Sequence, residues 1–325
     1  MQFARPLFAL AIATLCMHSH AHEYSALIKA KKFGEAERAV NAKLAAEPRN
    51  AVALSTKIEL ITGLGQQARY EEAVSLGEQC VAAHPQLSSC HEAHGDAVAT
   101  KALSSGMFAA MRHAGTIKDA YLKAVELDPK NFSARRNLLQ YYVQAPAVAG
   151  GGKDRAQALV TETGKVNAEA GKLLQALLNG MGDGYATGEA PALAAQPGDN
   201  EELQKLQRDA FSLLGSRYLN DKKFADADRM YRELQKRYPE NSGAFLGLGR
   251  VQMEQGKHAE AVALFEKGVA MDATAGLHYR MGQALQALRD KARATASFEK
   301  ALTMQPPLNS KAKADVQEQL KALRG

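Results

Sequence analysis

The fold is decided by residues 211–239, which read FSLLGSRYLNDKKFADADRMYRELQKRYP. The same arrangement of apolar and small positions returns in residues 245–273 (FLGLGRVQMEQGKHAEAVALFEKGVAMDA) and in residues 278–306 (HYRMGQALQALRDKARATASFEKALTMQP). Three glycines mark the same point of each copy and recur at nearly equal intervals: Gly215, Gly249 and Gly282. A fixed period of about 34 residues is typical of stacked repeats.

Each copy has the pattern of two amphipathic helices joined by a turn. Phe211, Leu214 and Tyr218 have the spacing that places residues on one face of a helix. Inside a helix, glycine costs about 1 kcal/mol relative to alanine, so Gly215 indicates a point where a neighbouring helix comes close. Pro239 ends the second helix because proline cannot continue it. One hairpin cannot bury its apolar face alone, so the copies are expected to stack.

The three copies resemble the tetratricopeptide repeat (TPR), whose pattern is an aromatic residue, Leu-Gly, Tyr, a small Ala, a second aromatic and a terminal Pro. The small alanines are Ala227, Ala261 and Ala294, and the second aromatics are Tyr231, Phe265 and Phe298. The copies depart from the pattern at Gln252, Ala273 and His278. The resemblance implies an all-α fold, a right-handed α-solenoid of about eight TPR-like helical hairpins with a C-terminal capping helix.

Weaker copies of the hairpin precede residue 211. The first three end at Pro48, Pro85 and Pro129, and the third carries about ten extra residues around Leu103–Ala114, which we interpret as an extension of both helices. Residues 179–200 hold five glycines and two prolines, which favour an irregular hinge. The expected division is residues 22–178 for an N-terminal TPR-like block, 179–200 for the hinge, 201–309 for the C-terminal TPR block and 310–325 for the capping helix.

Residues 1–21 have a different character from the rest of the chain. Arg5 precedes an apolar run at Leu7–Met17, and Ser19-His20-Ala21 is a small-x-small sequence. These are the three parts of a cleaved secretory signal peptide, with the cut expected after Ala21. No later segment is long and apolar enough to cross a bilayer. We therefore expect a periplasmic or secreted protein.

Cys80 and Cys90 are the only cysteines after the expected cut, and each lies five residues from Pro85. Equal distances from a turn between antiparallel helices put two residues at the same height, which is the geometry a disulfide needs. The alternative is a pair of buried free thiols. Because an exported protein meets an oxidising environment, we expect a Cys80–Cys90 disulfide.

Histidines near this pair suggest an alternative function. Residues 80–94 also contain His84, His91 and His94, so the alternative is a protein that binds a metal or small ligand there, or an uncharacterised hydrolase. The spacing matches no zinc module with closely paired ligands, and a disulfide would remove both sulfurs. No serine–histidine or other catalytic motif is present. We expect no metal, no cofactor, no catalytic residue and no enzymatic activity.

The function expected from the resemblance is a periplasmic scaffold, for example in envelope assembly or secretion. Such solenoids offer a concave groove, lined by the first helices, that binds extended peptides or helices. From helical phase, the groove of the three clear copies presents Ser212, Ser216, Asn220, Leu246, Arg250, Met253, Tyr279, Gln283 and Gln286. This surface lacks the Lys/Asn/Arg set with which chaperone-binding relatives hold a C-terminal carboxylate.

The net charge gives little guidance on the partner. It is +6 and spread along the chain in short pairs such as Arg135-Arg136, which are typical of solvated helix faces. We expect a protein or peptide partner in the cell envelope and no nucleic acid.

Overall fold

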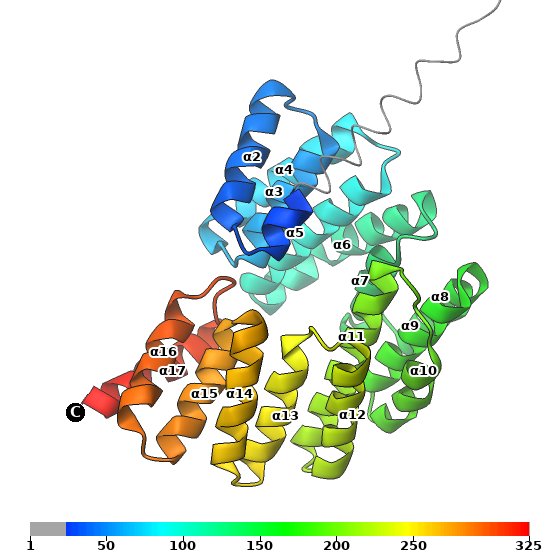
Figure 1. The fold of residues 1–325 in the computed structure, drawn as a ribbon. Helices are drawn as coiled ribbons and strands as arrows, with labels where there is room; N and C mark the ends of the chain where they lie inside the picture. The colour runs from blue at the N-terminus through cyan, green and yellow to red at the C-terminus, as the bar shows by residue number, and fades with distance from the viewer. Residues whose placement is uncertain (1–23, 325) are drawn as a thin grey trace, which may run out of the picture. The chain divides into compact units, whose positions relative to one another are not determined.

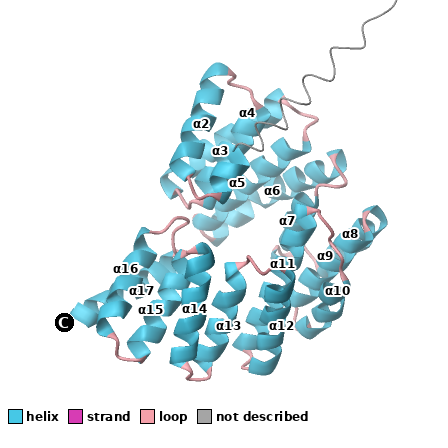
Figure 2. Cartoon of the chain, in the orientation of Figure 1, coloured by secondary structure: helices cyan, strands magenta, loops and turns pink. Residues whose placement is uncertain are grey.

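The computed structural model describes residues 24–324, and throughout this range the regular secondary structure is helical (Figure 1, Figure 2). The predicted signal peptide, residues 1–21, lies outside the described residues, as does His22. Among the helices that are described, none is long and apolar enough to cross a membrane.

The described helices follow one another as eight hairpins and a last single helix (Figure 1). In chain order the hairpins are residues 24–29 with α2 (Phe33–Ala46), α3 (Ala51–Gly63) with α4 (Tyr70–Ala83), α5 (Ser88–Ser104) with α6 (Met107–Leu127), α7 (Phe132–Gln144) with α8 (Lys153–Val166), α9 (Ala168–Met181) with α10 (Glu189–Ala194), α11 (Glu201–Asn220) with α12 (Phe224–Arg237), α13 (Ser242–Glu254) with α14 (His258–Asp272), and α15 (Ala275–Ala287) with α16 (Lys291–Thr303), and the last helix is α17 (Ser310–Arg324). The expected all-α solenoid with a C-terminal helix is confirmed.

The chain divides into two compact units between Asp128 and Pro129. The first unit contains the helices up to α6, and the second contains α7–α17. Residues 179–200 therefore lie inside the second unit, where they join α9 to α11. Whether they move as a hinge stays a prediction.

Asparagine side chains fix the starts of several first helices. The caps of α3, α7, α9 and α11 are Asn50, Asn131, Asn167 and Asn200, each of which accepts a hydrogen bond of 2.8–3.0 Å from the N–H three residues further on. An asparagine in this position satisfies one of the backbone donors that a helix start leaves free. Helix-ending Pro48 and Pro129 stand two residues before such caps, so a proline and an asparagine together define these boundaries.

Each of the last three hairpins is held by a contact between a glycine and an aromatic ring. The pairs are Gly215 with Tyr231, Gly249 with Phe265, and Gly282 with Phe298, and in each pair the two stand at positions i and i+16. A Cβ atom added at Gly215 would lie 2.7 Å from the ring of Tyr231, closer than real Cβ contacts. The close helix approach expected from these glycines is confirmed, and the ring of the second helix is the partner.

The turn after the first helix has one geometry in five hairpins. One residue adopts a left-handed φ of 57° to 74°: Lys31, Gly65, Lys222, Gly256 or Arg289. The following N–H then donates to the carbonyl five residues earlier, as from Lys223 to Tyr218 at 2.9 Å and from Gln66 to Ile61 at 3.0 Å. This is the Schellman C-cap. Two of the five turns lie in the weak N-terminal copies, so those copies are the same structural unit.

The third hairpin is longer because both of its helices continue past the corresponding contact. Gly95 faces Tyr121, and a Cβ there would lie 2.8 Å from the ring, but the two stand at positions i and i+26. α5 continues for nine residues after Gly95, whereas α11 continues for five after Gly215. α6 begins fourteen residues before Tyr121, whereas α12 begins seven before Tyr231. The expected extension of both helices is confirmed.

Residues 179–200 are held by a buried glutamine of α11. Gln207 is 1% exposed and donates to the carbonyls of Ala192 and Ala195, both at 2.9 Å. The hydroxyl of Tyr238 donates to Gln207 Oε1 at 2.7 Å. The segment contains a short helix, α10, and is packed through these bonds.

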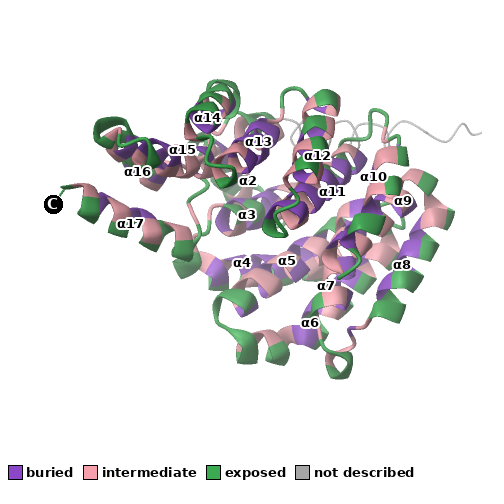
Figure 3. Cartoon of the chain, turned by 90° about the horizontal axis from the view of Figure 1, so that it is seen from below, coloured by how far each residue is buried: buried purple, intermediate pink, exposed green. Residues whose placement is uncertain are grey.

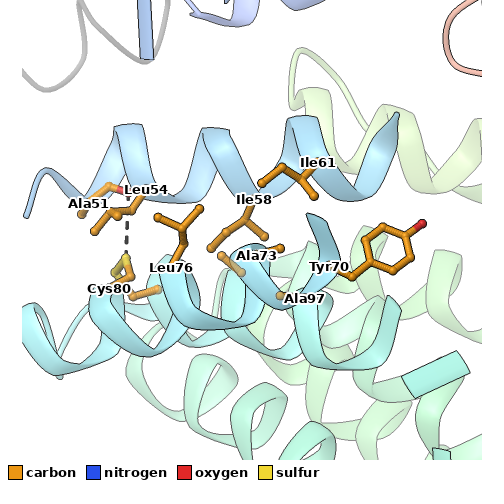
Figure 4. Packing of buried hydrophobic residues seen from close by; sticks show 11 residues of the cluster. Ala51, Leu54, Ile58, Ile61, Tyr70, Ala73, Leu76, Cys80 and Ala97 are labelled. Carbon is orange, nitrogen blue, oxygen red and sulfur yellow. Dashed lines mark hydrogen bonds between the residues drawn. A yellow bond between two sulfur atoms is a disulfide. The ribbon is translucent and has the colours of Figure 1, made fainter. Parts of the chain in front are cut away.

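Burial follows the helix faces that meet their neighbours, while most turns are exposed (Figure 3). In the first unit, Leu54 and Ile58 of α3 face Leu76 of α4, and Ala97 of α5 completes the cluster (Figure 4). Cys80 lies at the Ala51 end of the same cluster. The core of this unit is therefore continuous from one hairpin to the next.

Candidate functional site

The nine predicted groove residues lie on the first helices of the last three hairpins. Ser212, Ser216 and Asn220 are on α11, Leu246, Arg250 and Met253 are on α13, and Tyr279, Gln283 and Gln286 are on α15. Eight of the nine are half-buried, and Asn220 is exposed. None of them is a glycine-contact residue, and Leu246, Met253 and Tyr279 pack only partly against the buried cluster.

A hydrogen-bond network joins the α15 groove residues to α17. The hydroxyl of Tyr279 donates to Asp315 Oδ2 at 2.7 Å and accepts a bond of 2.9 Å from Gln283 Nε2. Gln286 Nε2 donates to Gln319 Oε1 at 2.8 Å. Burial and the bond to Asp315 both raise the pKa of Tyr279, so its hydroxyl remains a donor at neutral pH.

These bonds give α17 a second role besides capping. Its Val316 and Leu320 are buried in the cluster that contains Phe298, as a capping helix requires. Asp315 and Gln319, on another face of the helix, extend the predicted groove by one helix. Sequence reasoning missed both residues, although Asp315 and Gln319 follow their partners Tyr279 and Gln286 at close to the repeat period.

The α13 part of the surface is apolar. Leu246 and Met253 pack against the buried cluster around Phe265 while remaining half-buried themselves. At the start of α15, Gly276 has no side chain to cover Leu246, and a Cβ there would lie 3.7 Å from it. Two apolar side chains are therefore left within reach of a ligand.

Two arginines lie on neighbouring first helices, Arg250 on α13 and Arg280 on α15, near enough for the charge of one to act on the other. Burial lowers the pKa of Arg280, and the charge of Arg250 lowers it further, while Glu254 and Asp315 act more weakly in the opposite sense. Arg280 Nη1 donates to Gln283 Oε1 at 2.9 Å, and its guanidinium lies 5.0 Å from the ring centre of Tyr279.

Neither Arg250 nor Arg280 forms an ion pair with a carboxylate in the described part of the chain. A carboxylate brought between them would relieve their mutual repulsion. Sequence reasoning included Arg250 and missed Arg280, which stands one position beyond Tyr279 and outside the predicted stripe.

Cys80 and Cys90 are brought together as the sequence predicts. Their Cα atoms are 5.3 Å apart and their sulfurs lie at disulfide distance. Both residues are fully buried between α4 and α5. The pair therefore links α4 of the second hairpin to α5 of the third hairpin, within the first unit.

The histidines around this pair do not converge on a common point. His84 Nε2 lies 2.5 Å from the carbonyl of Arg49, and His91 Nε2 lies 3.0 Å from the carbonyl of Pro85. Burial lowers the pKa of His94, which lies against Gly77 of α4. Over residues 24–324 the structure brings no three potential metal ligands of the His, Cys, Asp and Glu types together.

Two protein-family models match the C-terminal part of the chain, over residues 213–276 and 275–307, and both describe a tetratricopeptide repeat. Residues 213–307 are tetratricopeptide repeats. The matched TPRs begin within α11 and end just after α16, so they include all nine predicted groove residues except Ser212.

Similar solved structures include yeast Tom70, at 13% identity and a TM-score of 0.53, where 90% of this chain aligns with 59% of that protein. A TPR protein from Parabacteroides merdae ATCC 43184 aligns over 95% of this chain and 98% of its own, at 16% identity and a TM-score of 0.46. At 13% identity the likeness to Tom70 concerns the fold alone. A search among curated proteins finds no match.

Proposed function

We propose that the surface formed by α13, α15 and α17 binds an extended or helical segment of a partner protein. TPRs are interaction scaffolds, and their first helices supply the binding surface. The segment we infer has an acidic side chain beside apolar ones. This is a non-catalytic role.

The observation that carries this proposal is the arginine pair beside half-buried apolar side chains. Arg250 and Arg280 offer a carboxylate two guanidinium groups, and guanidinium–carboxylate hydrogen bonds are among the stronger ones in proteins. Leu246 and Met253 offer apolar contact area next to them. Tyr279 and Gln283 are already fixed by hydrogen bonds, so they lose little freedom when a ligand arrives.

The experiment compares a charge-reversed surface with a matched control. Wild type, the Arg250→Glu/Tyr279→Ala double variant and Lys267→Glu are immobilised and exposed to an envelope extract, and captured proteins are quantified. Lys267 is exposed on the second helix α14, so its reversal changes the net charge equally but leaves the groove intact.

We expect Lys267→Glu to retain the partners of wild type and the double variant to lose them by about tenfold or more, the scale of removing an interface hot spot. Raised salt should weaken wild-type capture because the attraction between charges is screened. Capture of the same proteins at the same yield by the double variant would contradict the proposal.

We also propose that the protein works outside the cytoplasm, in the cell envelope. The predicted signal peptide supports this, as does a buried cysteine pair at disulfide distance. Cell fractionation with N-terminal sequencing tests it, because the exported protein should begin at His22. Full-length protein in the cytoplasmic fraction alone would contradict it.

A further inference from the structure

The extended tip of the α5–α6 hairpin, residues 103–111, exposes large apolar side chains. Met107 is 78% exposed, Phe108 91% and Leu103 62%, and Met111 is exposed one turn further along α6. Of the large hydrophobic residues that are exposed in the described part of the chain, these four lie close together in sequence, between positions 103 and 111. A concentration of this kind marks an interaction site.

The tip stands clear of its neighbours within the first unit. Lys101 of α5 forms an ion pair with Glu71 in the first turn of α4, so the two helices are level there. Beyond that level Ala102 is still buried, whereas residues 103–108 are all exposed. The seven additional residues of α6 lengthen it by about 10 Å at 1.5 Å per residue. The apolar side chains are thus carried on a projection, not in a groove.

Repeat packing does not require these side chains. The glycine–aromatic contact of this hairpin, Gly95 with Tyr121, is complete without the extension. The corresponding turn of the α11–α12 hairpin is Asn220-Asp221-Lys222-Lys223, and that of α13–α14 is Glu254-Gln255-Gly256-Lys257. The packing of the hairpin therefore does not account for four exposed apolar residues at a place where the turns of α11–α12 and α13–α14 are polar.

In the stretch of sequence that contains the tip, every charged side chain is basic. Residues 97–118 contain Lys101, Arg112, His113 and Lys118 and no Asp or Glu. Lys101 and Lys118 pair with Glu71 and Asp119, which lie outside this stretch. Arg112 is exposed, stands next to Met111, and has no carboxylate partner in the described part of the chain.

We propose that this tip docks on the surface of an anionic lipid bilayer. Met107 and Phe108 enter the boundary between headgroups and acyl chains, and Arg112 meets the lipid phosphates. A bilayer fits a projecting apolar tip with basic neighbours because it offers apolar depth below a layer of negative charge. The resulting attachment is peripheral and reversible.

The test uses the absence of tryptophan from the sequence. Phe108→Trp places a single indole on the tip, and Val148→Trp places one at a matched position, because Val148 is 88% exposed but lies in the second unit. Both are made in the chain beginning at His22, which keeps every described residue and omits the apolar leader. Vesicles are made either of phosphatidylcholine alone or of equal parts phosphatidylcholine and phosphatidylglycerol.

We expect the emission of the Phe108→Trp variant to shift to shorter wavelength with the anionic vesicles, and that of the Val148→Trp variant to stay unchanged. In vesicle flotation with the same chain, Met107→Ser/Phe108→Ser should bind about tenfold more weakly or worse than wild type. Arg112→Glu changes the charge by two units, so it should lose about 25-fold on anionic vesicles, at roughly fivefold per charge, and nothing on neutral ones.

Three results would overturn the proposal. One is no emission shift for the Phe108→Trp variant with either vesicle. Another is retention of vesicle binding by Met107→Ser/Phe108→Ser. The third is self-association of wild type, seen by sedimentation without lipid and abolished by the same double substitution, which would assign the tip to a protein surface. The five substitutions lie at four exposed positions, so an unchanged circular dichroism melt confirms that folding is intact.

Discussion

The α11–α12 and α5–α6 hairpins are built around the same contact and differ in what lies beyond it. In the α11–α12 hairpin, Gly215 and Tyr231 stand at positions i and i+16, and a short polar turn lies between them. In the α5–α6 hairpin, Gly95 and Tyr121 stand at i and i+26, and an apolar projection lies between them. The contact determines how two helices cross, and the chain past it is free of that constraint. Fold and function can therefore be separated within one hairpin.

The α3–α4 hairpin has a glycine at the position of the aromatic residue on its second helix. Gly77 stands four residues after Ala73, as Tyr231 stands four residues after Ala227. Gly77 then lies against His94 of the next helix, where a Cβ would come within 2.8 Å of the backbone.

The largest effect should come from filling a contact glycine. Gly249→Ile places a branched side chain where Phe265 already lies, and we expect the second unit to lose about 3 kcal/mol or more of unfolding free energy. The matched change is Gly115→Ala in α6, where no atom lies within 4 Å of the added Cβ. It should stabilise the first unit by about 1 kcal/mol. Urea denaturation measures both, and equal effects would contradict the distinction.

The next largest effect should be a loss of stability that is confined to the first unit. Opening the Cys80–Cys90 pair by Cys80→Ser/Cys90→Ser releases a ten-residue loop, which in the chain-entropy model is worth about 2–3 kcal/mol. Hydrogen exchange should speed up in α3–α6 and remain unchanged in α11–α16, because repeats stabilise mainly their neighbours. A thiol count on unreduced, exported protein gives the control, and two free thiols would refute the disulfide.

A smaller effect should follow at the left-handed turn residues. Lys222 and Arg289 adopt φ of 59° and 62°, where a side chain is strained, whereas Gly256 adopts 74° in the equivalent turn. Lys222→Gly and Arg289→Gly should each stabilise the second unit by about 1 kcal/mol, and Gly256→Ala should destabilise it by about as much. Thermal melts measure these effects. If all three substitutions shifted the melting temperature in the same direction, the shared turn geometry would be refuted.

The smallest effect should be a loss of stability in acid. Burial lowers the pKa of His94 in the first unit and of His278 in the second, and Lys300 lowers that of His278 further. The unfolded chain therefore binds more protons below about pH 6.5, so both units should weaken as the pH falls from about 7 to about 5.

His278→Phe should reduce this acid sensitivity in the second unit alone. It restores the aromatic residue found at Phe211 and Phe245, and it removes a buried Nδ1 that has no hydrogen-bond partner. Unfolding followed at two pH values checks it, and an undiminished acid loss in the second unit would show that another group is responsible.

Much of the fold could be predicted from the sequence because its main contacts are periodic. Glycines at a fixed spacing predict the close helix crossings, and the extra residues before Tyr121 predict the longer hairpin. The pairing of Cys80 with Cys90 follows from their equal distances to Pro85.

The missed features rest on contacts that are not encoded by the period. Gln207 holds residues 179–200 through hydrogen bonds to backbone carbonyls. Every residue has a backbone carbonyl, so the sequence does not show which ones accept these bonds. Arg280 is assigned to the groove because burial and the charge of Arg250 both lower its pKa. The helical phase of the sequence reveals neither effect. Asp315 and Gln319 could have been found by continuing the repeat into α17.

The account's central claim is that a partner protein occupies the surface of α13, α15 and α17, and site-specific crosslinking in living cells tests it most directly. A photoreactive amino acid replaces Met253 in the groove in one strain and Lys267 on the second helix α14 in another. We predict a discrete adduct with a partner protein from position 253 that disappears when Arg250→Glu is added, and little or none from position 267. Adducts of equal yield from both positions, or from position 267 alone, would contradict the claim.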